Sequence, residues 1–185
     1  MAKIIAVLDS CVLFPNILRD TLLSAFDIGL YQGYWSQIIL DGVTRNLIKR
    51  QILTEKKAKN LEDIIKSYFP EAMIDVSPEL IKKMTNHEGD YHVLATAVEA
   101  KAEIIVTFNL KHFQPKDTIQ WGVSAQHPDS FLLSLLQSDS GLMLEAINEQ
   151  ISRFTNPPLN RLQLLEMLAK DTPKFVNELK NYLSI

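Results

Sequence analysis

The sequence contains very little cysteine and no long apolar segment. Cys11 is the only cysteine among the 185 residues, which excludes a disulfide scaffold and a zinc site built from cysteines. Apolar runs such as residues 4–8 and 104–106 are much too short to span a bilayer. The first residues also lack the length and the cleavage site of a secretory signal peptide. We therefore expect a cytoplasmic protein that does not bind membranes.

The sequence also lacks a strong net charge. Its 19 basic and 22 acidic residues give a formal charge of −3, so no overall basic field indicates binding to nucleic acid. Basic residues are nevertheless concentrated in one predicted helical stretch, at Arg45, Lys49, Arg50, Lys56, Lys57, Lys59 and Lys66. This stretch could follow an RNA backbone or form a solvated helix face. For residues 56–66 we favour the solvated face.

Short apolar stretches predict the β-strands. Residues 3–8 and 102–107 are continuous apolar and β-branched runs, which is the pattern of strands buried on both faces of a parallel sheet. Weaker strand candidates cover residues 73–76 and 122–125. The segments between these stretches carry apolar residues at helical spacing. Strands that alternate with helices predict an α/β fold with a parallel sheet.

The chain changes character after about residue 126. From there to residue 183 the apolar residues keep a helical spacing, no strand-like run occurs, and the Pro157-Pro158 pair interrupts the pattern. We therefore predict an α/β domain over residues 1–125 and an α-helical C-terminal extension over residues 126–185.

Polar residues stop the two strongest strand candidates. Asp9 follows the first strand, Asn109 follows the second, and Asp90 opens the helix that leads into the second. Because ligands of parallel sheets bind outside the carboxyl ends of the strands, adjacent strands would bring these three side chains into one crevice. Neighbouring carboxylates repel unless a cation neutralises them, and an oxygen-rich cluster favours Mg²⁺ or Mn²⁺. Such an ion polarises a phosphodiester and activates water, so the pattern indicates phosphodiester hydrolysis.

Each of these residues also has an ordinary structural interpretation. Asp9 and Asn109 could simply turn the chain, and Asp90 could be the N-cap of its helix. Asp9 could also be the nucleophile of a phosphatase of the haloacid-dehalogenase type, but that motif needs a second Asp where Cys11 stands. Cys11 lacks a partner thiol and is better interpreted as a buried structural residue. Only the combination of the three polar residues carries the functional hypothesis.

Histidine supplies no metal motif at the level of the sequence. His87, His92 and His112 do not have the spacing of a zinc site. We interpret His92 as a packed or capping residue. His112 lies close to Asn109 in the sequence, where it could contact a phosphate or a group next to a metal ion.

Three blocks of the sequence resemble the signature motifs of PIN domains. The blocks are VLDSCVL at 7–13, DYHVLATA at 90–97 and IVTFNLKHF at 105–113, and each contains one of the three polar residues named above. The likeness to one VapC-like subgroup extends over further segments, at residues 15–20, 35–41 and 125–158. The resemblance therefore spans nearly the whole chain.

PIN domains are metal-dependent ribonucleases and include the VapC toxins of bacterial toxin–antitoxin pairs. The resemblance implies a three-layer α/β/α sandwich with a central parallel sheet and an acidic pocket that holds Mg²⁺ or Mn²⁺. It places Asp9 and Asp90 on two acids of the family, and Asn109 on a position where either Asp or Asn occurs. It also implies an RNA substrate and a cognate antitoxin as a protein partner.

The sequence departs from the family pattern at Gly42. The Glu of the family usually follows a hydrophobic Ile-Leu pair by two positions, and here Gly42 stands at that place with Asp41 before it. Adjacent residues of a helix point about 100° apart, so Asp41 could complete the site only if the backbone shifted. A second departure is His112, at a position where the subgroup tends to carry Asp.

Two hypotheses follow from these observations. In the first, the chain is an endoribonuclease whose metal ion is bound by Asp9, Asp90 and Asn109, with Asp41 in support. In the second, the missing Glu leaves a catalytically weakened or silent PIN fold that works as a binding or regulatory module. Candidates for contacts to the substrate or around the ion are Ser10, Arg19, Thr107, Lys111 and His112. A homodimer or antitoxin surface, or equally the core, could be formed by the aromatic residues Tyr31, Tyr34 and Trp35.

Overall fold

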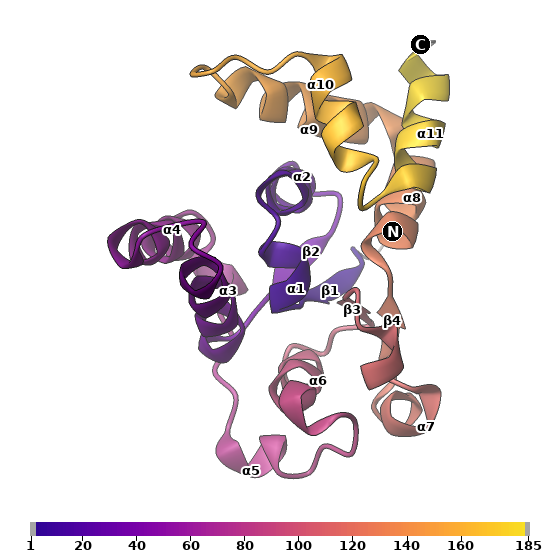
Figure 1. The fold of residues 1–185 in the computed structure, drawn as a ribbon. Coiled ribbons are helices and arrows are strands. Elements are labelled where there is room, and N and C mark those ends of the chain that lie inside the picture. The colour runs from indigo at the N-terminus through magenta and orange to yellow at the C-terminus, as the bar shows by residue number, and fades with distance from the viewer. Residues whose placement is uncertain (1–2, 184–185) are drawn as a thin grey trace.

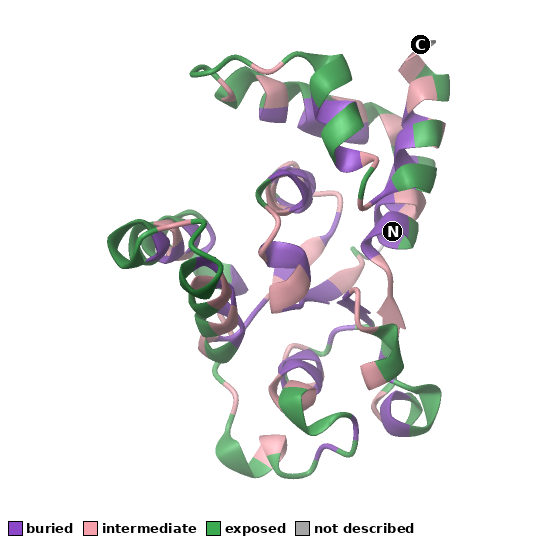
Figure 2. Cartoon of the chain, viewed as in Figure 1, coloured by how far each residue is buried: buried purple, intermediate pink, exposed green. Residues whose placement is uncertain are grey.

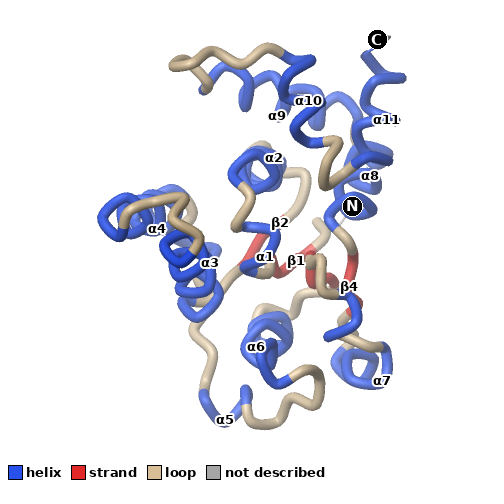
Figure 3. The backbone as a smooth tube through the Cα atoms, in the orientation of Figure 1, coloured by secondary structure: helices blue, strands red, loops and turns tan. Residues whose placement is uncertain are grey.

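A computed structural model describes residues 3–183 of the chain. Its centre is a four-stranded sheet with the strand order β2-β1-β3-β4, and all three pairings are parallel. The strands are β1 (Ile5–Leu8), β2 (Gln32–Tyr34), β3 (Ile104–Val106) and β4 (Ser124–Gln126). Figure 3 shows these short strands side by side in the middle of the molecule. The α/β fold with a parallel sheet is therefore confirmed.

The two central strands have the burial that their continuous apolar sequences predict. All three residues of β3 are buried, as are the last three of β1. Each fully buried Val, Leu or Ile side chain contributes roughly 1.5–3 kcal/mol relative to an exposed one, so these strands anchor the sheet. Leu8 pairs with Val106. The residues that follow β1 and β3 consequently leave the sheet at the same edge, next to one another.

The prediction of a strand at residues 73–76 is wrong. Met73 forms only a single parallel bridge to Trp35, and the N–H of Ile74 donates to the carbonyl of Trp35. The edge strand of the sheet is instead β2, whose Gln-Gly-Tyr sequence contains no apolar run. Gly33 packs closely there, since a Cβ atom at this position would lie 3.1 Å from the ring of Phe26. The strand predicted at 122–125 forms two residues later, as β4.

Helices cover both faces of the sheet, and in Figure 1 α2 lies above it and α6 below it. The α-helices of this part of the chain are α1 (Ser10–Leu13), α2 (Asn16–Asp27), α3 (Gln37–Lys49), α4 (Glu55–Tyr68), α5 (Pro78–Ile81), α6 (Tyr91–Glu99) and α7 (Pro115–Thr118). Short 3₁₀-helices are η1 (Pro70–Ala72), η2 (Glu88–Asp90), η3 (Leu110–His112) and η4 (Ile119–Trp121). These layers match the α/β/α sandwich that the resemblance implies.

The C-terminal extension consists of α8 (Pro128–Ser138), α9 (Ser140–Arg153), α10 (Arg161–Leu168) and α11 (Pro173–Leu183). Helices α9 and α10 pack against α2. At this contact the Thr21 hydroxyl donates to Gln150 Oε1 at 2.8 Å, and Gln150 Nε2 donates to the carbonyl of Ile17 at 3.2 Å. Phe131 and Phe175 belong to the same hydrophobic cluster as the strands. The extension thus shares one continuous core with the α/β part, and the division near residue 126 remains a prediction.

The aromatic residues near β2 belong mainly to the core. Figure 2 shows that much of the chain in and around the sheet is buried. Tyr31 and Trp35 have no exposed surface. The Tyr31 hydroxyl donates to the carbonyl of Leu22, and its ring packs edge-on against Phe131. Tyr31 and Trp35 therefore do not form the docking surface considered as one alternative, and Tyr34 is half-buried beside them. None of the helices between residues 3 and 183 combines the length and apolar character needed to cross a bilayer.

Candidate active site

Asp9 lies directly after β1 and is almost completely buried, with 2% of its surface exposed. Its backbone N–H donates to the carbonyl of Val106, which continues the pairing of β1 with β3. The carboxylate accepts hydrogen bonds from Thr107 Oγ1 at 2.7 Å, Cys11 Sγ at 3.1 Å and Ser10 Oγ at 3.3 Å. These bonds replace part of the water that a buried carboxylate loses. These hydrogen bonds thus fix the orientation of the Asp9 carboxylate at the carboxyl end of β1.

Thr107 connects Asp9 with Asn109. Thr107 is the first residue after β3 and is fully buried. While its hydroxyl donates to Asp9, its Oγ1 accepts the backbone N–H of Asn109 at 3.0 Å. Asn109 itself is half-buried and stands at the start of η3. The two sequence-predicted residues that follow β1 and β3 therefore lie in one hydrogen-bonded group.

Asp90 occupies the N-cap position of α6, but its side chain caps nothing there. Its carboxylate instead faces His112, whose Nδ1 lies 2.6 Å from Asp90 Oδ2. Because an ionised carboxylate only accepts hydrogen bonds, the ring nitrogen is the donor. Asp90 is therefore the N-cap residue of α6, as one alternative held, but its side chain makes no capping hydrogen bond.

Asp90 is connected through His112 to the segment that follows β3. The N–H of His112 donates to the carbonyl of Asn109 at 2.8 Å. His112, which faces Asp90, is therefore bonded to the segment after β3, whose Thr107 donates to Asp9. His92 lies on the first turn of α6, and the charges of both carboxylates act on its pKa. Burial lowers the pKa of His92, although the charges of Asp9 and Asp90 act to raise it. Hydrogen bonds thus connect Asp9 through Thr107 with Asn109, and Asn109 with His112, the partner of Asp90.

Comparison with known families gives a result that agrees with this geometry. Residues 6–111 match the family model described as "PIN domain". This chain belongs to the PIN domain family. Residues 128–181 match the model described as "VapC50 C-terminal domain", so the helical extension is also a recognised unit.

A curated relative gives the same family likeness. The chain is 41% identical over 98 residues to a protein of Mycobacterium tuberculosis named "Putative ribonuclease VapC50". The match covers 52% of this chain and 57% of the relative. The chain thus matches little more than half the length of that relative. The likeness is to a VapC-type ribonuclease.

Gly42 stands at the position where PIN domains usually carry a Glu. This position faces the residues next to Asp9. A Cβ atom at Gly42 would lie 3.0 Å from Ser10 Cβ and 3.2 Å from Ser10 Oγ, directly beside the residue that follows Asp9. Asp41 is exposed, and its carboxylate accepts a hydrogen bond from Gln37 Nε2 at 2.7 Å. Gln37 Nε2 also donates to Glu62 on α4. Asp41 thus points along α3 toward α4, and the structure does not bring it to Asp9.

Two further sequence-predicted residues have separate roles. The Nη1 of Arg19 donates to the carbonyls of Leu13 at 2.8 Å and Phe14 at 3.2 Å, so Arg19 caps the end of α1. Burial lowers the pKa of Arg19, while the charge of Asp20 acts to raise it. Lys111 is exposed in η3. The Ser10 hydroxyl donates to the Asp9 carboxylate at 3.3 Å.

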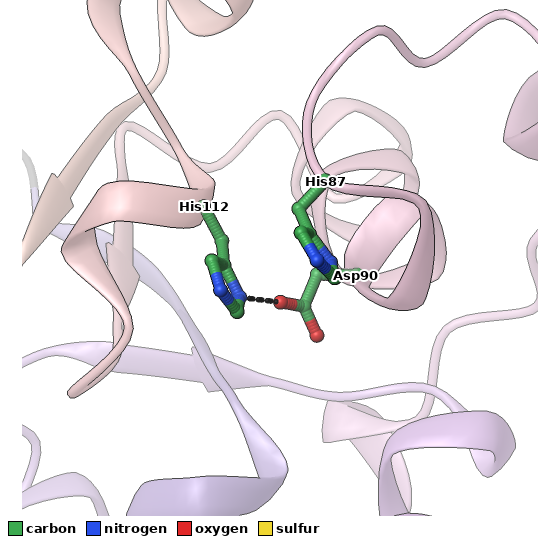
Figure 4. Close-up of side chains that lie close together, drawn as sticks. All are labelled: His87, Asp90 and His112. Carbon is green, nitrogen blue, oxygen red and sulfur yellow. Dashed lines mark hydrogen bonds and ion pairs between the residues drawn. The ribbon is translucent and has the colours of Figure 1, made fainter.

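His87 is the residue of this region that the sequence reasoning missed. His87, Asp90 and His112 place one potential ligand atom each within 4.8 Å of one another. Figure 4 shows the two imidazole rings next to the Asp90 carboxylate. The rings stack with their centroids 4.0 Å apart and their planes 11° from parallel. The spacing of three residues between His87 and Asp90 could have indicated one shared turn, whereas the approach of His112 depends on the fold.

The donor set fits a divalent cation of the kind that PIN domains use. Asp9 and Asp90 supply carboxylate oxygens and Asn109 an amide oxygen, which are the ligands that Mg²⁺ and Mn²⁺ take. Within residues 3–183 the hydrogen-bond donors to the Asp9 carboxylate are neutral hydroxyl and thiol groups, and Asp9 takes part in no ion pair. An almost fully buried carboxylate without a cationic partner is a natural ligand for a bound cation.

Proposed function

We propose that this chain is a metal-dependent endoribonuclease of the VapC toxin type. It would hydrolyse RNA phosphodiesters at the edge of the sheet where Asp9, Asp90 and Asn109 lie. The observation that carries the proposal is the buried Asp9 carboxylate, which Thr107 joins to Asn109 and which has only neutral hydrogen-bond partners. The likeness to a VapC-type ribonuclease supports the choice of substrate and reaction.

Asp9, Asp90 and Asn109 would hold Mg²⁺ or Mn²⁺. When bound, such an ion polarises a phosphodiester and lowers the pKa of a bound water, which supplies the attacking group at neutral pH. Thr107 and Ser10 keep the Asp9 carboxylate in a fixed orientation. Lys111 is exposed beside Asn109, where its ammonium can pair with an RNA phosphate. A cognate antitoxin is proposed as the protein partner, on the strength of the VapC likeness.

The proposal is tested by RNA cleavage assays with purified protein. The wild type should cleave RNA in Mg²⁺ or Mn²⁺ and lose cleavage after chelation with EDTA. Asp9→Asn and Asp90→Asn should each abolish cleavage, because each removes a charged oxygen ligand while nearly preserving shape. Asp63→Asn is the matched control, since it makes the same chemical change at an exposed residue of α4. Cleavage that persists in Asp9→Asn at the wild-type rate would refute the proposal.

The second hypothesis, a silent PIN fold, is favoured by the Gly42 packing against Ser10. It predicts that the wild type binds Mn²⁺ at Asp9 and Asp90 but cleaves no RNA in any divalent ion. The same assays therefore separate the two functions.

A further inference from the structure

The turn that carries Asp90 is bonded to the segment that carries His112. The N–H of Asp90 donates to the carbonyl of His87 at 2.9 Å, so a single turn presents both side chains. The N–H of His87 donates to the carbonyl of His112 at 3.3 Å, which ties this turn to η3. Asn86 Nδ2 additionally donates to the carbonyl of Asp90 at 3.2 Å. The backbone thus fixes the three potential ligands near one another, and only side-chain torsions remain free.

These ligands differ in chemistry from the oxygen ligands around Asp9. Imidazole nitrogen suits Co²⁺, Ni²⁺ and Zn²⁺, whereas Mg²⁺ and Mn²⁺ take mainly oxygen ligands. Two histidines and one carboxylate are also the ligand count of a metal site that keeps a further position open for water or substrate. The cluster is half-buried to exposed, so an ion can reach it from solvent.

We propose that His87, Asp90 and His112 form a binding site for a divalent transition-metal ion, with a preference for Co²⁺ or Zn²⁺ over Mg²⁺. The inference rests on the proposed function in one respect, because Asp90 belongs to both sets of ligands. The two histidines make this edge of the sheet more nitrogen-rich than a purely acidic pocket.

The side chains need only small movements to bind such an ion. Ligand atoms of a tetrahedral ion at about 2.0–2.1 Å lie roughly 3.4 Å apart. The His112–Asp90 pair at 2.6 Å must therefore open by about 0.8 Å, and the most distant pair, within 4.8 Å, must close by about 1.4 Å at most. One of the stacked rings must also turn, because parallel rings do not direct their lone pairs at one point.

His87 is the ring that can turn. It is exposed, and its Nδ1 accepts a single hydrogen bond, from the N–H of Gly89 at 3.2 Å. His112 by contrast is half-buried and already faces the carboxylate. Rotation of His87 from the stack toward Asp90 completes the three-ligand site.

The test is a Co²⁺ titration of untagged protein, followed by calorimetry and by the visible absorption of bound Co²⁺. The wild type should bind Co²⁺ and should keep it in excess Mg²⁺. His87→Gln should weaken binding by about tenfold or more, since even an indirect partner of a metal ligand contributes that much. His127→Gln is the matched control, because His127 is also an N-cap histidine whose Nδ1 accepts the N–H two residues later.

Binding of Co²⁺ by His87→Gln as tight as by the wild type and by His127→Gln would overturn the inference. Circular dichroism establishes that each variant is folded, and His87→Ala provides a second removal of the ligand. Asp9→Asn separates this site from the proposed function, because Asp9 is not among the three ligands. It should lose RNA cleavage yet keep the Co²⁺ spectrum. Mg²⁺-dependent cleavage without any Co²⁺ binding would leave the proposed function intact and refute the inference alone.

Discussion

Replacement of Thr107 by Val tests the hydrogen bonds that hold Asp9. The two side chains have nearly the same shape, but Val has no hydroxyl. Thr107→Val removes the 2.7 Å bond to the Asp9 carboxylate and leaves the Asn109 N–H without its 3.0 Å partner. The variant should therefore be less stable, and its Asp9 carboxylate should be less well oriented.

The expected loss of stability can be worked out from these two contacts. A hydrogen bond to a charged group contributes about 1.5–3 kcal/mol, and an unsatisfied buried group costs about 1–3 kcal/mol. Because Asn109 is only half-buried, we take the lower part of the second range and expect a loss of about 2–4 kcal/mol in the free energy of unfolding. For a chain of this size that corresponds to a decrease of about 4–16 °C in Tm.

The assay is thermal unfolding monitored by circular dichroism, with Thr107→Ser as the matched control. Ser keeps the hydroxyl and loses only a methyl group, so it should cost about 1 kcal/mol. RNA cleavage should likewise fall further in Thr107→Val than in Thr107→Ser. Equal Tm values for the two variants would refute the reasoning, because the loss would then come from packing and not from the hydroxyl.

Four further predictions concern charge and packing in the α/β part of the chain. Burial acts to raise the pKa of Glu62, but hydrogen bonds from Lys66 and other donors lower it to about 2. Above pH 4.5 the wild type should therefore have a larger free energy of unfolding than Glu62→Gln, and the difference should disappear as the pH falls toward 2. Urea titrations measure this difference. A difference that does not change with pH would contradict the prediction. Burial, together with the charge of Asp9, raises the pKa of the Cys11 thiol to about 12, so iodoacetamide at pH 8 should label Cys11 only after unfolding; rapid labelling of the native protein would disprove it. Gly42→Ala gains about 0.5–1 kcal/mol of helix propensity, but its Cβ atom would lie 3.0 Å from Ser10 Cβ. Urea unfolding should therefore show a net loss in the free energy of unfolding, which the additional substitution Ser10→Gly relieves. A Gly42→Ala variant more stable than the wild type would contradict this prediction. Asp41→Asn should leave RNA cleavage unchanged, because the Asp41 side chain is exposed on α3. A loss of cleavage as large as that of Asp9→Asn would contradict this and assign Asp41 to the active site.

The fold could be predicted where burial alone dictates the pattern. Both central strands, β1 and β3, are buried on both faces, so their sequences are continuous apolar runs. The edge strand β2 could not be predicted, because Gln32-Gly33-Tyr34 becomes a strand only through its pairing with β1. Residues 73–76 carry β-branched side chains without a partner strand, and there local propensity was misleading.

The site could be predicted as far as it depends on strand ends and helix phase. Asp9 and Asn109 follow paired strands, so the topology brings them together. Asp41 was expected to support the site, and the angular separation of adjacent helical residues explains why its side chain does not lie where a Glu at position 42 would. The contact of His87 with His112 could not be predicted, because it joins two loops whose approach depends on tertiary packing.

We propose that Asp9, after β1, and Asp90, before α6, would hold the same divalent ion. Crystals grown with saturating Mn²⁺ test it directly through the anomalous scattering of the ion. We predict a peak coordinated by carboxylate oxygens of both Asp9 and Asp90. A peak that contacts neither carboxylate, or no peak at this edge of the sheet, would contradict the account.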